Sequence, residues 1–291
     1  MVLWIVSHPI GAVFARSFLW LVLATLVFVP LELMFPLRQK RPIGAESATN
    51  LAWYGVNSIF TLSLIAVPAA LIASVTAMVI PPAISTTVDA LPLGIRMVLA
   101  MIVGEIGFYW GHRWSHEWRW LWRFHAIHHS AQDMTYLVNT RMHPVDMLFT
   151  RLCGVTLLLA TGLSSPTGSD SGLIIGGVLF AGSLWSYFIH SNISWRLSWF
   201  ENILTTPAFH HWHHTRTDHA NHNYASMLPL MDRLFGSYYL PKQWPEEYGT
   251  DTFVADNIFH QLTSPFWPER VKAVTVSKMD DSADRRPTLD D

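Results

Sequence analysis

Long apolar segments alternate with short polar ones through the first two thirds of the chain. A helix needs about 20 apolar residues to cross the ~30 Å hydrocarbon layer of a bilayer. Five segments approach or exceed that length, at residues 12–34, 57–80, 93–111, 145–163 and 173–190. Pro68 interrupts the second, and both 57–80 and the pair within 145–190 are also compatible with hairpins that do not cross fully. The pattern predicts an all-α polytopic membrane protein with about four to five spans.

The distribution of basic residues predicts an orientation. Arg38, Lys40 and Arg41 directly follow the first apolar segment, whereas loops 81–92 and 164–172 contain no Lys or Arg. Cytoplasmic loops carry the excess of basic residues in membrane proteins. With this loop in the cytoplasm, a model with five crossings places every histidine-rich segment on the cytoplasmic side. We expect these segments to form a cytosolic helical cap.

Composition agrees with a membrane protein and limits the kinds of site. About half of the residues are apolar and 14% are charged, against about 25% charged in soluble domains. The net charge of −2 gives no indication of a nucleic-acid partner. The single cysteine, Cys153, lies in an apolar segment, which indicates a buried thiol and excludes a disulfide framework or a cysteine-based metal site. The N-terminus lacks the charged region of a signal peptide, so residues 12–34 are interpreted as the first span.

Histidine is concentrated in one part of the chain, with 13 of the 15 residues between positions 112 and 222. Three boxes have the spacings H-x-x-x-H, H-x-x-H-H and again H-x-x-H-H, which place the side chains on one helix face. Neutral imidazole is the commonest protein metal ligand. Eight imidazoles exceed what one four-coordinate ion needs, so the boxes predict two metal ions, each with an open position. The eight residues are His112, His116, His125, His128, His129, His210, His213 and His214.

The identity of the metal follows from chemistry as much as from spacing. Imidazole accepts Zn, Fe, Cu and Ni. The zinc-protease motif H-E-x-x-H is absent, because Glu117 follows His116 but Trp120 stands where the second histidine should be. Zinc also has no redox chemistry. A histidine-rich pair of irons at a membrane surface could bind O2 and attack an unactivated C–H bond of a lipid.

Glu105 is the acidic residue most closely associated with the boxes. It precedes His112 by seven residues, two helical turns back on the same face, and a charge within a span is by default a functional-site hypothesis. We expect it to accept the N–H of a liganding histidine. The alternatives are a direct metal ligand and a buried structural hydrogen bond. On the same segment, Gly107 and Gly111 form a small-x-x-x-small pair that predicts close helix packing.

Two histidines outside the boxes are further candidate ligands. His190 ends the last span and faces the same side as the boxes, so it is predicted to bind metal. His143 precedes Pro144, which is expected to start a helix, and could be a ligand or a structural loop residue. The histidines expected not to bind metal are His8, His211, His219, His222 and His260.

The chain resembles the fatty acid hydroxylase/sterol desaturase superfamily over roughly residues 100–241. The resemblance is to the branch with bacterial sterol-desaturase-like proteins, C-5 sterol desaturases and alkylglycerol monooxygenase. It rests on the segments EIGFYWGHRWSH, HAIHH, HSNI, TPAFHHWHH, NYA and DRLFGSY. It implies that the eight box histidines are di-iron ligands and that His190 is the further histidine of the HSN segment. Asn139, His143 and Pro144 match the segment before the next helix.

Two departures from the family pattern bear on substrate choice rather than on the metal site. Ala225 replaces the usual glycine after Asn223 and Tyr224, and His211 stands where some relatives have arginine. The resemblance also implies two irons per chain, O2 as co-substrate and an external electron donor of the ferredoxin, cytochrome b5 or flavin reductase type. No fused cytochrome b5 module is expected in this chain.

We therefore predict a membrane-bound non-haem di-iron oxygenase that hydroxylates or desaturates a fatty acyl, sterol-like or ether lipid. The expected regions are 1–98 (N-terminal spans), 99–241 (catalytic) and 242–291 (a polar tail, with 276–291 disordered), and compact loops favour a bacterial inner membrane. One alternative is a metal-ion transporter, which would distribute ionisable residues through several spans. The other is a membrane zinc hydrolase, with Glu117 or Asp146 as general base.

Overall fold

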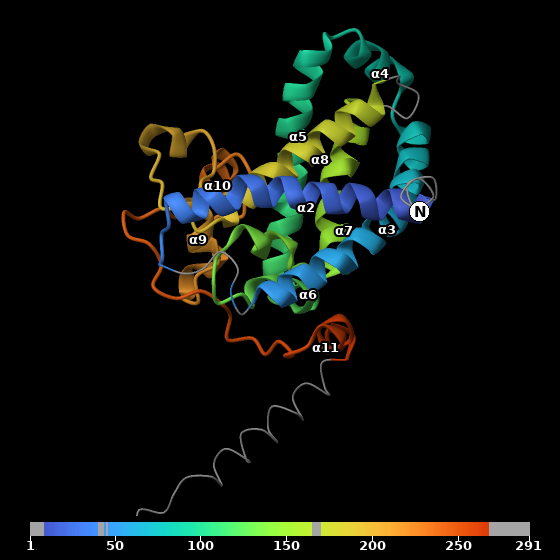
Figure 1. The fold of residues 1–291 in the computed structure, drawn as a ribbon. Helices are drawn as coiled ribbons and strands as arrows, with labels where there is room; N and C mark the ends of the chain where they lie inside the picture. The colour runs from blue at the N-terminus through green and yellow to red at the C-terminus, as the bar shows by residue number, and fades with distance from the viewer. Residues whose placement is uncertain (1–8, 40–43, 45, 165–169, 268–291) are drawn as a thin grey trace, which may run out of the picture.

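The regular elements of the chain are helices, as a computed structural model that describes residues 9–39, 44, 46–164 and 170–267 shows (Figure 1). Within those residues the extended pairings are two isolated bridges, Pro36–Ile193 and Thr215–Tyr248. The predicted all-α fold is therefore confirmed, while the predicted disordered tail at 276–291 lies outside the described residues.

The α-helices are α2 (Pro9–Met34), α3 (Ser47–Val79), α4 (Pro82–Asp89), α5 (Leu93–Glu117), α6 (Arg119–His129), α7 (Pro144–Ala160), α8 (Ser171–His190), α9 (Pro207–His213), α10 (Leu230–Phe235) and α11 (Ile258–Thr263). Four 3-10 helices cover Tyr136–Thr140, Ser198–Asn202, Asp218–Asn221 and Ser264–Phe266.

Among the described residues, three helices are long and apolar enough to cross a membrane, namely Ala15–Met34 of α2, α5 and α8. Helix α3 is a fourth if its two parts, Ser47–Phe60 and Leu64–Val79, which are bent by 46°, count as one span. The fifth predicted span, at 145–163, is not among them. Its helix α7 has 17 residues, which corresponds to about 26 Å at 1.5 Å per residue and is shorter than the hydrocarbon layer.

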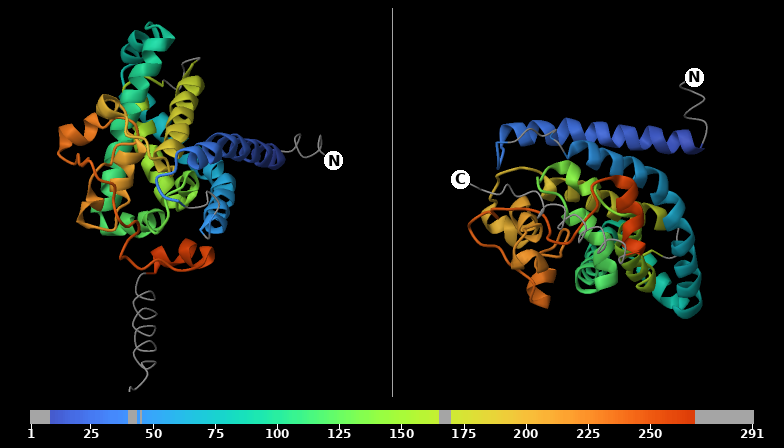
Figure 2. Two further views of the ribbon diagram at one scale, coloured as in Figure 1. Left: turned by 60° about the vertical axis from the view of Figure 1, so that its left-hand side comes forward. Right: turned by 90° about the horizontal axis from the view of Figure 1, so that it is seen from below.

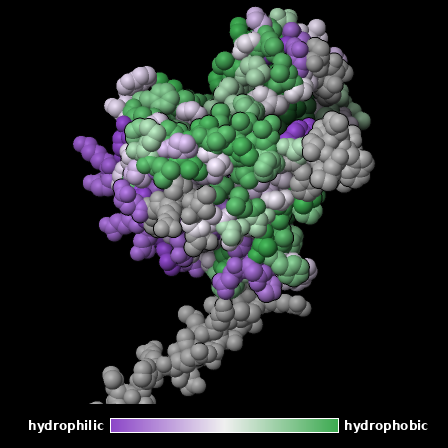
Figure 3. Space-filling view, in the orientation of Figure 1, coloured by the Kyte–Doolittle hydropathy of each residue, from purple (hydrophilic) through white to green (hydrophobic). Residues whose placement is uncertain are grey.

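The outward faces of these helices are apolar. Leu26 on α2, Leu71 on α3 and Val98 on α5 are each more than half exposed. Figure 3 shows apolar side chains over the middle of the molecule, where α2 and α8 lie, and hydrophilic ones on the side formed by the segments after α9. This separation is the one expected when one part of a protein faces lipid and another faces water.

Helices α5 and α7 pack closely enough for their backbones to touch. A Cβ atom on Gly107 would lie 2.5 Å from the carbonyl oxygen of Cys153 and 2.6 Å from the Cα of Gly154. A Cβ on Gly111 would lie 3.1 Å from the Cys153 side chain. The predicted close packing at these glycines is confirmed. Because α5 continues six residues beyond the expected end at 111, the first histidine box lies on the same helix as this contact.

The remaining segments gather at one end of the bundle, where α5 and α8 end (Figure 2). We call residues 118–143 and 191–267 the cap. Helix α2 lies along one side of the bundle, next to α3 and α8. The end of α2 is joined to the cap through Arg38, whose guanidinium donates to the carbonyls of Pro245 and Glu246 at 2.7 Å. These contacts connect the segment after α2 to the C-terminal part of the cap.

Candidate metal centre

Nine of the ten histidines predicted as ligands converge in two adjoining groups. Within each group, one ring nitrogen from every member lies within 4.8 Å of the others. Eight of the nine side chains are buried, and His116 is partly buried. The five-histidine group consists of His112, His116, His125, His129 and His213, and the four-histidine group of His128, His190, His210 and His214.

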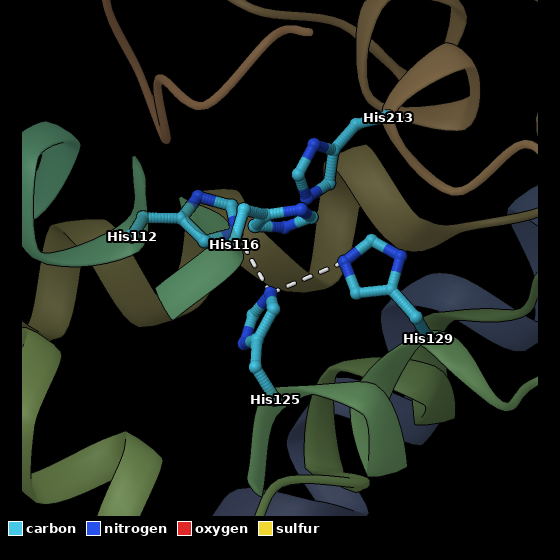
Figure 4. Close-up of side chains that lie close together, drawn as sticks. All are labelled: His112, His116, His125, His129 and His213. Carbon is cyan, nitrogen blue, oxygen red and sulfur yellow. Dashed lines mark hydrogen bonds between the residues drawn. The ribbon is translucent and has the colours of Figure 1, made fainter. Parts of the chain in front are cut away.

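Helices from both the bundle and the cap supply each group. In the five-histidine group, the rings that point toward one another come from α5, α6 and α9 (Figure 4). In the four-histidine group they come from α6, from the C-terminal end of α8 and from α9 and the residue after it. The two groups are in direct contact, since the rings of His129 and His214 are stacked with centroids 4.4 Å apart. Two ions bound in the groups would therefore be neighbours.

Six of the nine imidazoles have an oxygen atom within hydrogen-bond distance of Nδ1. Because carbonyl and carboxylate oxygens only accept, Nδ1 must carry the proton in these residues, which leaves the Nε2 lone pair free for a metal. In the five-histidine group the pairs are His112 with the Tyr224 carbonyl (2.7 Å), His116 with Asn221 Oδ1 (3.3 Å), His125 with Asp146 Oδ2 (2.9 Å) and His213 with the His222 carbonyl (2.8 Å). In the four-histidine group they are His128 with the Arg141 carbonyl (3.0 Å) and His190 with the Ser186 carbonyl (2.7 Å).

The free nitrogens face one another in a way that calls for a cation. Nε2 of His112 lies 3.2 Å from Nε2 of His125, and Nε2 of His128 lies 3.1 Å from Nε2 of His190. With the protons on Nδ1, each contact brings two lone pairs together and is no hydrogen bond. Protonation does not relieve it, because burial and neighbouring histidines lower the pKa of His125 and His128 well below the ordinary value. The residues present therefore fit bound metal ions.

A buried asparagine fixes two of the carbonyl acceptors. Asn223 has φ 60°, in the left-handed region that asparagine tolerates better than most residues. Its side-chain amide donates to the carbonyls of Phe209 at 2.8 Å and Tyr239 at 2.6 Å, and its Oδ1 accepts from the backbone N–H of Tyr239. The residues on either side of Asn223 carry the carbonyls that accept from His213 and His112. The N-Y segment thus holds two imidazoles in place.

Glu105 does not make the contact that the sequence analysis expected. Its Oε1 accepts from the backbone N–H groups of Met227 at 2.7 Å and Leu228 at 3.2 Å. The residue lies on the expected helix face, but two turns of helix separate it from His112 by about 10.5 Å. Glu105 therefore supports the 226–228 backbone, which corresponds to the structural alternative, and its role at the metal centre stays a prediction.

Asp146 makes the contact that was assigned to Glu105. Its Oδ2 accepts from Nδ1 of His125, and its Oδ1 accepts from the Ser115 hydroxyl at 3.0 Å. Both Asp146 and His125 are buried. From the sequence alone, Asp146 is a candidate only for the general base of a hydrolase. The available signal was a carboxylate in the first turn of an otherwise apolar helix.

His143 lies outside both groups, in a position that corresponds to the structural alternative rather than to a ligand. It caps the N-terminus of α7, where its Nδ1 accepts from the Val145 N–H at 3.1 Å, and its Nε2 donates to the Leu262 carbonyl at 3.2 Å. Both ring nitrogens are therefore used. His211 is likewise engaged elsewhere, by the Tyr248 hydroxyl at 2.8 Å and the Ser191 carbonyl at 3.1 Å.

A cavity of about 400 Å³ lies between α2, α3, α5, α7 and α8. Phe108 lines it and places its ring 5.5 Å from the ring of His112. Ser186 also lines it and accepts from His190 through its carbonyl. The end of the cavity is thus one residue away from both groups.

Comparison with known proteins connects this arrangement to lipid oxidation. Residues 97–237 match the fatty acid hydroxylase family. The chain is 32% identical over 181 residues to the ornithine lipid hydroxylase OlsE of Rhizobium tropici, a match that covers 61% of this chain and 52% of that protein. It is 31% identical over 146 residues to the alkylglycerol monooxygenase of Danio rerio (48% of this chain, 30% of that protein) and 27% identical to that of Xenopus tropicalis (50% and 30%).

These matches leave part of each relative uncovered. The chain spans about half the length of the ornithine lipid hydroxylase and less than a third of the two monooxygenases. No solved structure matches the chain.

Proposed function

Because the chain belongs, through residues 97–237, to the fatty acid hydroxylase/sterol desaturase superfamily, we propose that it is a membrane-bound oxygenase that hydroxylates a lipid. One observation carries this proposal: two groups of buried imidazoles lie next to the end of a cavity between apolar helices. Phe108 and Ser186 separate the two features by a single residue. A lipid in the cavity would bring a C–H bond to the metal-ligand groups.

The five- and four-histidine groups are proposed to hold two irons, one in each. Iron bound there would supply the redox chemistry that activates O2. The reaction balances as RH + O2 + 2 electrons + 2 protons giving ROH + H2O, with the electrons from a separate ferredoxin, cytochrome b5 or flavin reductase. The number of imidazoles, their neutral state and the Nδ1 acceptors support this assignment.

The chain's own residues control water and geometry at this site. Eight of the nine imidazoles are buried, so bulk water has little access to the reacting centre. Asp146 and the backbone carbonyls fix the ring orientations. On the bundle side, Phe108 and the 226–228 backbone held by Glu105 define the wall that a substrate would contact.

We propose that the protein is integral to the membrane with the cap on the cytoplasmic side. The apolar outward faces of α2, α3, α5 and α8 support the first part. The basic residues that follow α2 support the second. In this orientation a soluble electron donor would reach the cap, and a lipid would reach the cavity from the bilayer.

Lipid analysis under ¹⁸O2 tests the proposed reaction. Cells that express the wild type should contain a lipid heavier by one oxygen atom, with the label from ¹⁸O2. Cells that express His128→Asn, which removes one imidazole of the four-histidine group, should lack this product at equal protein level. A product lighter by two hydrogens would show that the reaction is desaturation and not hydroxylation. No change in any lipid class, in cells with a competent electron donor, would overturn the proposal.

A further inference from the structure

Arg151 projects a positive charge into the cavity without a protein counter-ion. It lies in the middle of α7 and lines the cavity. Within the described part of the chain, no hydrogen-bond acceptor or carboxylate pairs with its guanidinium. The buried arginines Arg96 and Arg141 are paired, Arg96 with Asp89 and Asp170, and Arg141 with Glu46. The described residues therefore leave the charge of Arg151 without a counter-ion, and the cavity gives it access to one from outside the protein.

The surroundings of Arg151 are those of a binding site for an amphipathic molecule. An ionised group among apolar helices is costly unless it is paired. Tyr187 lines the cavity together with Arg151. Ser183 and Tyr54 also line the cavity, whereas Leu158, Val155 and Ile175 line it with apolar side chains. Such a cavity suits a molecule with both a polar group and a hydrocarbon chain.

The distance along α7 indicates which part of that molecule meets the metal-ligand groups. Arg151 follows Asp146, the partner of His125, by five residues, which is about 7.5 Å along a helix. An acyl chain spans about 15 Å, half of the hydrocarbon layer. An anion bound at Arg151 would therefore bring carbons in the half of the chain nearer the polar head, rather than its far end, to the imidazoles.

We propose that Arg151 binds an acidic group of the lipid substrate, a carboxylate or a phosphate, and so selects a carbon near the polar head for oxidation. Guanidinium binds both groups through paired, charge-assisted hydrogen bonds. The second part of this inference, the position of oxidation, rests on the proposed function. The first part, recognition of an anion, stands on the cavity alone.

Lipid binding tests anion recognition separately from oxidation. The probes are an N-acyl amino acid with a free carboxylate, its methyl ester with the same chain, and a lysophosphatidate. Dissociation constants are measured on the full-length, iron-loaded protein in nanodiscs. The wild type should bind the free acid or the phosphate at least 10-fold more tightly than the ester. Arg151→Gln should lose that preference, Arg151→Lys should keep part of it, and Arg119→Gln, which removes an exposed charge from the cap, should behave as the wild type.

The outcomes separate this inference from the proposed function. Equal binding of acid and ester by the wild type would overturn anion recognition, whatever happens to the variants. An equal loss of acid and ester binding in Arg151→Gln would make the residue structural and would also overturn it. Acid-selective binding with no oxygenated product would leave recognition intact and remove the proposed function. An oxygen placed at the far end of the chain would overturn the choice of a carbon near the head.

Discussion

Asp146 differs in kind from the other groups that accept a proton from the ligand imidazoles. The remaining acceptors are backbone carbonyls and one side-chain amide. A carboxylate that accepts from a metal-bound histidine fixes the ring and raises the basicity of its other nitrogen. The Ser115 hydroxyl occupies the second oxygen of Asp146, so the carboxylate is itself held in one orientation.

Asp146→Asn should weaken metal binding while leaving the fold in place. The amide has the shape of the carboxylate but lacks its charge, and loss of such a partner typically costs 10- to 100-fold in metal affinity. Competition with a chelator measures the change. Asp251→Asn, at a side chain 78% exposed in an ion pair with Arg216, is the control and should match the wild type. Unchanged affinity in Asp146→Asn would mean that this contact does not tune the metal.

Helical spacing predicted which histidines come together, but not what holds them. Side chains at i and i+4 share a face whatever the surrounding fold, so the boxes could be recognised from sequence, and His190 from its position at the end of a predicted span. The acceptor carbonyls of Tyr224, His222 and Arg141 belong to residues whose side chains have no part in the contact, and no sequence signal marks them. The partner of Glu105 could not be predicted, because spacing gives the face of a helix but not which segment packs at that depth.

At the scale of elements, each H-x-x-H-H box serves both groups. In α6, His125 and His129 join the five-histidine group and His128 joins the other. In the second box, His210 and His214 join the four-histidine group and His213 joins the other. The first and last histidines of each box thus share one group, and the middle one faces its neighbour. Two helices therefore bind the two sites into one unit.

The contact between α5 and α7 positions this unit relative to the cavity, and Gly107→Ala should disturb it. A Cβ at position 107 meets backbone atoms of Cys153 and Gly154, which cannot rotate away, and overpacking of this kind costs about 1–3 kcal/mol. Since α5 carries His112 and α7 carries Asp146, metal content should fall together with thermal stability.

Gly94→Ala in the same helix is the matched control. Nothing lies within 4 Å of a Cβ at that position, and alanine favours a helix over glycine by up to about 1 kcal/mol. Thermal unfolding and metal analysis of both variants decide the matter. A Gly107→Ala protein as stable as Gly94→Ala would show that α5 and α7 can separate without consequence.

The boundaries of the helices were less predictable than their existence. Helix α3 begins at Ser47, ten residues before the predicted segment. The apolarity pattern missed these residues because the first turn is polar and this end of the helix contacts the cap. There the Asn50 carbonyl accepts from Thr140 and the Asn57 amide donates to the Met142 carbonyl. An apolarity pattern detects lipid-facing turns and misses turns buried against protein.

Across the whole molecule, apolar surface, cavity and imidazole groups follow one another from the bundle to the cap. This order supports oxidation of a lipid that enters from the bilayer while electrons arrive through the cap. The sequence predicted the membrane character and the convergence of the boxes, since both depend on local pattern. The cavity, and with it the exposure of Arg151 to a substrate, depends on the packing of five helices and could not be predicted. The division into regions 1–98, 99–241 and 242–291 stays a prediction.

Metal analysis of the purified full-length protein tests the central claim, two irons held by two histidine groups, most directly. The wild type should contain about two irons per chain with the Mössbauer signature of a coupled pair. His128→Asn should lose at least one iron, whereas His143→Asn, in which asparagine can still cap α7, should keep both. Stoichiometric zinc in protein from iron-rich, zinc-poor medium, or full iron content in His128→Asn, would contradict the account.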